Sequence, residues 1–374
     1  MRRRRFISGL VLFGFIRNLS AKEISFPQVV PDHLLQFPRD HGAHPGFRTE
    51  WWYATGWLAT ESNQPLGFQV TFFRSRLPFA TDNPSAFTPR QIVFAHAALS
   101  DPTFGRLRDD QRAARAALDL AGAAENTTDA WIDNWRFVLD GDTYRAVIPA
   151  REFALDLNLT AHAPPLLEGE DGYSRKGPRP GEASYYYSRP HLDVRGAIER
   201  GKGSERVTGS AWLDHEWSSD YLAPEAAGWD WCGINLERGG ALMAFRIRSK
   251  NGGVVYAGGT LKTENAVTKF TPARITFTPL RSWRSPRTSV EYPVAMRVTA
   301  GAETWDLEPL MNDQELDSRA STGAIYWEGA MRAMQGGKEA GRGYLELTGY
   351  WKPLQMSNQL GYKGGAVPRG EGNG

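Results

Sequence analysis

Carboxylates beside tryptophans form two clusters in the sequence that could carry acid chemistry. The first is HPGFRTEWWY at 44–53, and the second combines WLDHEW at 212–217 with GWDW at 228–231. A carboxyl group in an apolar pocket stays protonated near neutral pH and can protonate a substrate, while an aromatic face stabilises a neighbouring cation. The clusters therefore indicate either an acid catalyst beside an aromatic wall or buried ion pairs that close the ends of a β-structure.

Strand alternation distributes these side chains over two faces, because successive residues of a strand point to opposite sides. Arginines are the candidate partners of any acid that the fold buries, and the sequence offers Arg48, Arg246 and Arg248. The residues expected to share a face are Glu50 with Trp52, Trp212 with Asp214 and Glu216, and His215 with Trp217.

Several standard catalytic signatures are missing from the sequence. It contains no G-x-S-x-G elbow, no H-E-x-x-H motif, no phosphate-binding loop and no dinucleotide fingerprint. His41 and His44 have a spacing that ligands can have, but Pro45 and neighbouring glycines place them in a loop, and no metal site is expected. The single cysteine, Cys232, lies in an apolar stretch and is expected to pack as a small buried side chain.

Composition limits the fold and the functions that these residues can serve. A length of 374 residues suits two domains, and a net charge of +2 excludes the basic surface of a general nucleic-acid binder. One cysteine excludes a disulfide framework. The 13 Trp, 13 Tyr and 18 Phe beside 39 Gly and 23 Pro are typical of an all-β protein with many turns.

The first residues have the pattern of an export signal. Arg2 to Arg5 precede the apolar run 6–16, and Ala21 is a small residue suited to cleavage, so 1–21 is expected to be a signal peptide. The arginines fit the twin-arginine pattern as well as an ordinary signal. A periplasmic location is therefore expected.

Short apolar and alternating runs separated by turn residues predict strands along almost the whole chain. The cleanest is 153–161, where every second residue is apolar. The Ala-, Leu- and Arg-rich segment 106–124 predicts the one helix. Residues 163–190, which include Tyr186, predict a long loop. The expected organisation is an N-terminal barrel at 33–220 containing that loop, a C-terminal barrel at 226–354 and a loose tail at 363–374.

A set of motifs spread over 44–351 resembles the AttH-type "predicted secreted hydrolase" family, which is related to bacterial carotenoid 1,2-hydratases (hydroxyneurosporene synthases). The resemblance implies two lipocalin-like, antiparallel up-and-down β-barrels side by side. It also implies that a His-x-Trp pair and a downstream acid matter for hydration. The motifs are HPGFRTEWWYATGWL, RAARAALDLAGA followed by WIDNW, GYSRKG with YYYSRP, GSAWLDHEW, GWDWCGINLERGGALMAFRIR and GYLELTGYW.

The carry-over of hydratase residues is incomplete. His215 and Trp217 match the His-x-Trp pair, and Asp230 is the plausible downstream acid. The tyrosine that hydratases have near this acid is not evident, because Trp229 precedes Asp230. The candidate catalytic residues are His215, Trp217, Asp230, Asp214 and Glu216, and the candidate ligand-binding residues are Glu50, Trp52, Trp212, Trp229, Trp231 and Tyr186.

These observations favour an exported, monomeric protein that binds an elongated apolar molecule, such as a polyene or a lipid, and hydrates a C=C bond. In that hypothesis Asp230 or Asp214 protonates the alkene, and His215 and Glu216 position the water. Hydration involves no redox change, so no cofactor is expected of such a lyase. The alternatives are a non-catalytic carrier that serves an envelope transporter, which needs the cavity but not the acids, and a hydrolase with an acid pair.

Overall fold

The computed structural model describes residues 24–77, 90–201 and 203–354. These residues form 23 β-strands and four short 3-10 turns, and they contain no α-helix. No helix in this part of the chain is long and apolar enough to cross a bilayer. The expected signal peptide at 1–21 and the expected loose tail at 363–374 lie outside the described residues. The 3-10 turns are η1 Arg39–His41, η2 Pro102–Phe104, η3 Glu237–Gly239 and η4 Pro272–Arg274.

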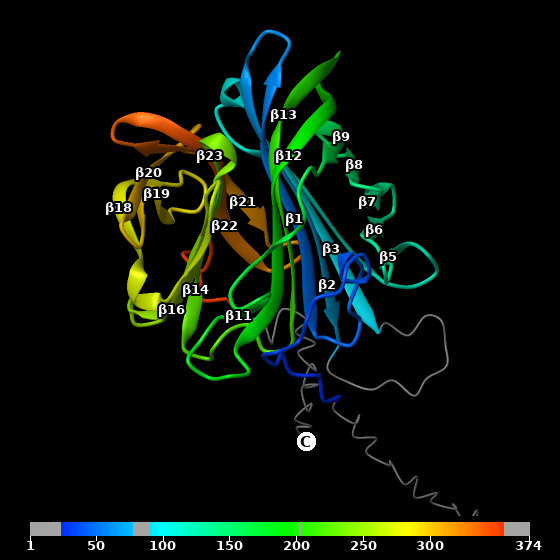
Figure 1. The fold of residues 1–374 in the computed structure, drawn as a ribbon. Coiled ribbons are helices and arrows are strands. Elements are labelled where there is room, and N and C mark those ends of the chain that lie inside the picture. Colours follow the sequence, from blue (N-terminus) through cyan, green and yellow to red (C-terminus); the bar gives the residue numbers. More distant parts are fainter. Residues whose placement is uncertain (1–23, 78–89, 202, 355–374) are drawn as a thin grey trace, which may run out of the picture.

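The first half of the described chain forms one antiparallel sheet of 13 strands (Figure 1). Strands adjacent in sequence are mostly adjacent in the sheet, and β1 pairs with β13 to join the two ends of the meander. The sheet curls until β4 contacts β6, which makes a nearly closed barrel. Its strands are β1 Thr49–Thr60, β2 Pro65–Arg76, β3 Gln91–Ser100, β4 Arg108–Arg115, β5 Ala121–Ala123, β6 Asp129–Ile132, β7 Trp135–Asp140, β8 Thr143–Pro149, β9 Phe153–Thr160, β10 Leu166–Leu167, β11 Tyr173–Arg175, β12 Ala183–Arg200 and β13 Gly203–Ser218.

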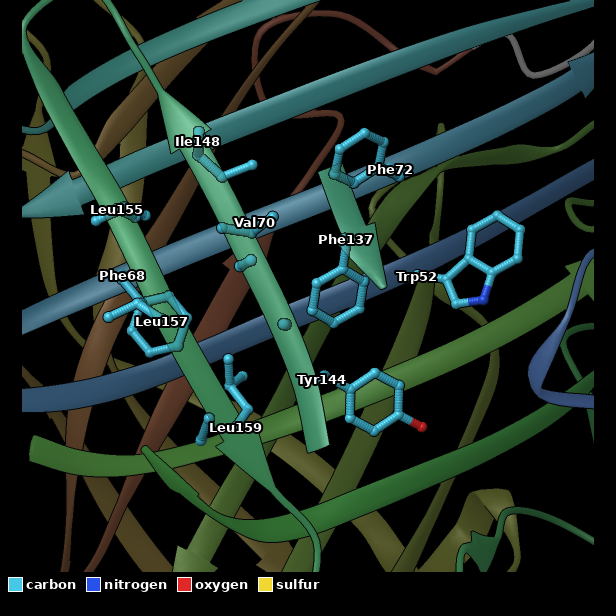
Figure 2. Close-up of a cluster of buried hydrophobic side chains, with 14 of the residues drawn as sticks. Trp52, Phe68, Val70, Phe72, Phe137, Tyr144, Ile148, Leu155, Leu157 and Leu159 are labelled. Atoms are coloured by element: carbon cyan, nitrogen blue, oxygen red, sulfur yellow. The ribbon is translucent and has the colours of Figure 1, made fainter. Parts of the chain in front are cut away.

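Alternating apolar side chains fill the interior of this barrel (Figure 2). In β9, the predicted alternation at 153–161 is confirmed, because Leu155, Leu157 and Leu159 are buried while the residues between them are more exposed. Phe68 of β2 and Trp52 of β1 lie in the same cluster. Each such side chain contributes about 1.5–3 kcal/mol when it is fully buried, so the core fixes which face of every strand points outward.

The second half repeats the arrangement as an antiparallel sheet of 10 strands beside the first (Figure 1). It curls around its own core, and β15 and β16 contact β18. The all-β prediction of two lipocalin-like barrels side by side is confirmed. The strands are β14 Ala226–Leu236, β15 Ala241–Ser249, β16 Val254–Lys262, β17 Val267–Phe270, β18 Ile275–Arg284, β19 Glu291–Ala300, β20 Glu303–Pro309, β21 Glu315–Ser318, β22 Ala324–Gln335 and β23 Lys338–Leu347.

Aromatic side chains from both sheets form a third buried cluster where the barrels meet. Trp57 of β1 donates a hydrogen bond from Nε1 to the carbonyl of Gly343 on β23, at 3.0 Å. Trp231 of β14 donates from Nε1 to the Tyr186 hydroxyl, at 3.1 Å. The outward faces of β1 and β13 are therefore covered by the second barrel, and residues on these faces are buried between the barrels.

The helix predicted at 106–124 is wrong. Its first part is β4, which pairs with β3, and its end contains β5. The composition favours a helix locally, but the barrel needs a strand here to close, and tertiary pairing overrides a weak propensity.

The loop predicted at 163–190 also differs from the structure. It contains the short strands β10 and β11, and β12 begins at Ala183. The tyrosines at 185–187 belong to β12 and pair with β13 instead of lying in a loop. Aromatic residues favour such half-buried sheet positions.

Candidate active site

A cavity of about 120 Å³, open to solvent on one side, lies between the two barrels. One wall comes from β1, β2, β3 and β13 of the first sheet, and the other from β14, β22 and β23 of the second. Aromatic side chains dominate both walls, and four carboxyl groups interrupt them. The aromatic and acidic lining residues are Trp51, Tyr53, Phe73, Phe94, Tyr221, Trp229, Trp231, Tyr326, Asp214, Glu216, Glu328 and Glu346.

The pairing of β1 with β13 explains which predicted residues reach the cavity. Tyr53 pairs with Asp214 and Trp51 with Glu216, and all four line the cavity. The intervening pairs, Trp52 with His215 and Glu50 with Trp217, point to the opposite face of the sheet. Alternation therefore predicted the faces correctly, but the two faces belong to two separate clusters.

Asp214 is held by three hydrogen-bond donors at the edge of the cavity. Its carboxylate accepts from Trp212 Nε1 at 2.6 Å, Ser188 Oγ at 2.6 Å and the Tyr186 hydroxyl at 2.7 Å. Burial raises the pKa of Asp214 to about 7, although the three donors favour the ionised form. Tyr186 and Trp212 thus contact Asp214, but neither of them lines the cavity.

Glu216 is the cavity acid that has a cation beside it. Lys176 Nζ lies 2.9 Å from Glu216 Oε1, and both side chains are almost completely buried. Ser184 also donates a hydrogen bond to Oε1. Burial raises the pKa of Glu216, and Lys176 opposes that rise. Among the four cavity acids, Glu216 is therefore the one best provided for a charged state.

Glu328 and Glu346 complete the set of acids, and sequence reasoning missed both. They are direct cross-strand neighbours on β22 and β23. Trp229 Nε1 donates to Glu346 at 2.7 Å, and burial raises the pKa of Glu346 to about 7. Neither oxygen of Glu328 has a hydrogen-bond partner among the described residues. Burial and the adjacent Glu346 raise the pKa of Glu328 well above its ordinary value, although the Tyr53 and Tyr326 hydroxyls oppose that rise.

The sequence does carry a signal for this second pair. Glu328 is the only charged residue of 324–331, and Glu346 is the only one of 343–350. A lone carboxyl in an otherwise apolar strand marks a buried polar group.

Glu50 forms the centre of a second polar cluster, on the barrel-interior side of β1 and β13. Its oxygens accept from Arg74 Nε at 2.8 Å, His44 Nδ1 at 2.7 Å and His215 Nε2 at 2.9 Å. Burial would raise the pKa of Glu50, but Arg74 and the histidines hold it well below its ordinary value. His215 stacks on Trp52, and His44 on Trp217. None of these aromatic or histidine side chains lines the cavity.

The atoms of His44, Glu50 and His215 lie within 4.8 Å of one another and are a group that could hold a metal ion. Arg74 pairs with Glu50 at 2.8 Å and supplies a positive charge at the same place. Every potential ligand atom already has a hydrogen-bond partner. The geometry is therefore that of a complete ion-pair network, which links the 44–48 segment to the barrel.

Asp230 is not among the residues that line the cavity. It is fully buried and accepts hydrogen bonds from Arg246 Nε at 2.6 Å, Arg248 Nε at 2.9 Å and the Tyr350 hydroxyl at 3.0 Å. Arg246 and Arg248 were two of the arginines expected to pair with the acids. Because two cations hold this carboxylate, its geometry suits an ion pair and does not suit a proton donor. Its neighbours Trp229 and Trp231 do line the cavity.

Comparison with known proteins agrees with this architecture. No curated protein matches the chain. The crystal structure of an AttH candidate from Nitrosomonas europaea is 52% identical, with a TM-score of 0.82, and the match covers 87% of this chain and all of that one. Kievitone hydratase from Nectria haematococca shares the fold at 14% identity, with a TM-score of 0.65 and coverage of 88% and 98%. The model of the AttH-like family matches residues 28–350, and the chain belongs to that family.

Proposed function

We propose that this protein binds an elongated apolar molecule, of the polyene or lipid type, between its barrels and hydrates a C=C bond in it. The observation that carries the proposal is the cavity itself. It combines aromatic walls with a buried acid, Glu328, whose oxygens have no hydrogen-bond partner among the described residues and whose polar neighbours include the Tyr53 and Tyr326 hydroxyls and Glu346. A neutral carboxylic acid against an apolar ligand is the group that can protonate an unactivated alkene.

The reaction needs a protonated acid for its first step, protonation of the alkene, and a charged carboxylate for its second, the addition of water. Glu328 gives its proton to one alkene carbon, and a carbocation forms at the other. The faces of Trp229 and Trp231 stabilise that cation. A water oxygen then bonds to the cationic carbon and releases a proton to Glu216, whose charged form Lys176 favours. Return of that proton to Glu328 through solvent completes the cycle without a cofactor.

This assignment keeps Asp214 and Glu216 from the sequence-based hypothesis and replaces Asp230 with Glu328 as the acid. His215 acts here only from the far side of the sheet, where it orders Glu50 and Trp52. Asp214 and Glu346 contribute negative potential near the developing cation. The hydratase activity named for the Nectria haematococca protein of the same fold supports a hydration reaction.

Incubation of the purified protein with acyclic carotenoids tests the proposal. The expected result is a product heavier by one water, found by mass spectrometry, together with quenching of tryptophan fluorescence on binding. Glu328→Gln should abolish the product and retain the quenching. Absence of both signals across carotenoids, free fatty acids and isoprenoid alcohols would refute the proposal.

A non-catalytic carrier is the second candidate, favoured by the position of His215, Trp217 and Asp230. These residues match the hydratase pattern but do not line the cavity. Under this alternative the ligand is retained without turnover, and Glu328→Gln leaves retention unchanged. We also propose export through the 1–21 signal, and fractionation of the native host would locate the mature protein in the periplasm.

A further inference from the structure

A chain of hydrogen bonds crosses from the first barrel to the second beside the cavity. It starts at Gln111 on β4, passes through Ser321 in the turn between β21 and β22, continues through His96 on β3 and ends at Tyr326 on β22. His96, Tyr326 and the acid Glu328 all line the cavity. His96 itself is 1% exposed and plays no part in the mechanism above.

The direction of each hydrogen bond follows from the first member of the chain. Gln111 donates from Nε2 to the carbonyl of Asp317 at 2.6 Å, so its Oε1 points to Ser321. The backbone N–H of Ser321 donates to this oxygen at 2.9 Å. Ser321 Oγ lies 2.8 Å from the same oxygen and 3.2 Å from the carbonyl of Ser318. Both are acceptors only, and a Ser321 hydroxyl hydrogen directed to either of them leaves the Oγ lone pairs facing His96.

The tautomer of His96 follows from this direction. Ser321 Oγ lies 2.8 Å from His96 Nε2, and in this arrangement it accepts there, so Nε2 carries the hydrogen. Burial lowers the pKa of His96 to about 3, so the ring is neutral and Nδ1 has no hydrogen. The Tyr326 hydroxyl, 2.9 Å from Nδ1, must then donate to it.

The consequence appears in the cavity, two residues further along β22. With its hydrogen directed to His96, Tyr326 presents only oxygen lone pairs to the cavity. Glu328 lies on the same face of the strand, and its oxygens have no hydrogen-bond partner among the described residues. The hydroxyls of Tyr326 and Tyr53 are the neighbouring groups that would lower the pKa of Glu328 by donating to it. A carboxylate is stabilised by donors, and the nearest phenol on its own strand is prevented from donating.

We infer that His96 is a positioning residue that fixes Tyr326 as a hydrogen-bond acceptor and thereby keeps Glu328 protonated. The inference deepens the function proposed above, because it explains how the acid keeps its proton, but the tautomer and the protonation state are properties of the free protein. The same geometry favours a ligand that brings an O–H or N–H donor to Tyr326.

The other groups that face Glu328 act in the same direction or are neutral. Glu346 on β23 disfavours a second charge, and Tyr344 on the same strand has a pKa well above its ordinary value. Tyr53 on β1 is the exception, and an experiment must distinguish its effect on Glu328 from that of Tyr326. Its hydroxyl is buried without a partner among the described residues, so its hydrogen remains free to turn toward a carboxylate.

Histidine NMR tests the first part without any substrate. Long-range ¹⁵N–¹H correlation spectra of the intact protein should show His96 as neutral, with the hydrogen on Nε2, between about pH 5 and pH 8. A doubly protonated ring, or a hydrogen on Nδ1, would overturn the inference whatever the protein does to carotenoids.

Infrared spectroscopy tests the second part, through the carbonyl band of a protonated carboxyl. The band that disappears in Glu328→Gln belongs to Glu328. We expect this band in the spectrum of the wild type at neutral pH. His96→Phe frees the Tyr326 hydroxyl to donate, so the midpoint of this band should fall by about one pH unit or more.

Two matched variants distinguish this effect from general damage to the site. His96→Asn places an oxygen acceptor near the position of Nδ1 and should restore the wild-type midpoint. Tyr326→Phe removes the phenol and should leave the band in place, as should Tyr53→Phe. An unchanged midpoint in a folded His96→Phe protein, or a fall in Tyr326→Phe as well, would contradict the positioning role. If the band behaves as expected but no hydration product forms, only the proposed function fails.

Discussion

Replacement of Lys176 by Met isolates the charge that the cavity imposes on Glu216. The ammonium lies 2.9 Å from Glu216 Oε1, so at an effective dielectric constant of 20 the pair attraction is about 6 kcal/mol. Methionine has a similar length and can pack against the Phe245 and Tyr186 rings, which lie 4.2 and 4.7 Å from Nζ. The substitution therefore removes the charge and keeps most of the packing.

The loss of stability in this variant is limited because Glu216 can take up a proton. Protonation costs less free energy than keeping an unpaired buried charge. Protonating a carboxyl with an unfolded-state pKa of about 4.5 at pH 7 costs roughly 3.5 kcal/mol, because each pH unit corresponds to about 1.4 kcal/mol. The free energy of unfolding of Lys176→Met should thus fall below that of the wild type by no more than about 3.5 kcal/mol at pH 7.

The sign of the pH dependence follows from the raised pKa of Glu216 in the folded variant. The variant should equal the wild type below about pH 4.5 and lose stability as the pH rises toward the folded-state pKa. Urea denaturation followed by tryptophan fluorescence, at half-unit steps from about pH 4.5 to 8, measures this. The double variant Lys176→Met, Glu216→Gln should remove the pH dependence. A stability loss that is constant over the range would show that Glu216 is not the charge that Lys176 balances.

Three further outcomes are expected. Glu328→Gln should lower the hydration rate at least about 100-fold, with little change in ligand affinity measured by fluorescence titration, because only proton donation is lost. Asp230→Asn should lower the free energy of unfolding by about 3–5 kcal/mol, since Arg246 and Arg248 lose their buried partner, while ligand binding persists; loss of binding without loss of stability would contradict this. Dialysis against a chelator should leave the melting temperature unchanged, because Arg74 already balances Glu50; a fall of several degrees would reveal a bound ion.

Much of the fold could be predicted, because each strand carries its own local signal. The alternation at 153–161 and the aromatic runs at 50–60 and 212–217 identified strands and their faces correctly. The prediction for 106–124 was wrong because its Ala- and Leu-rich composition favours a helix. In the structure the edge of β3 has unpaired backbone groups, and a strand in this segment pairs with them. Such long-range pairing leaves no local trace in the sequence.

Only some of the residues that line the cavity could be predicted from the sequence. Asp214, Glu216, Trp229 and Trp231 stand beside other unusual residues and attracted attention. Glu328 required knowledge that β22 and β23 face β1 and β13 across the seam between the barrels. The separation of His215 from Asp214 required knowledge of which face the second barrel covers. Both facts depend on docking of the two halves.

Four acids lie between the two barrels. The free energy that holds the barrels together is therefore linked to the pKa values of these acids. Any separation of the halves admits water, and hydration lowers the cost of ionising each carboxyl. Ionised acids at this spacing repel one another; Lys176 offsets the charge of Glu216, whereas the buried cation Arg74 is paired with Glu50. Opening therefore favours further ionisation and further separation of the barrels, and closure on an apolar ligand favours the protonated form of Glu328. Exclusion of water from the space between the barrels thus favours both their association and the protonated form of Glu328.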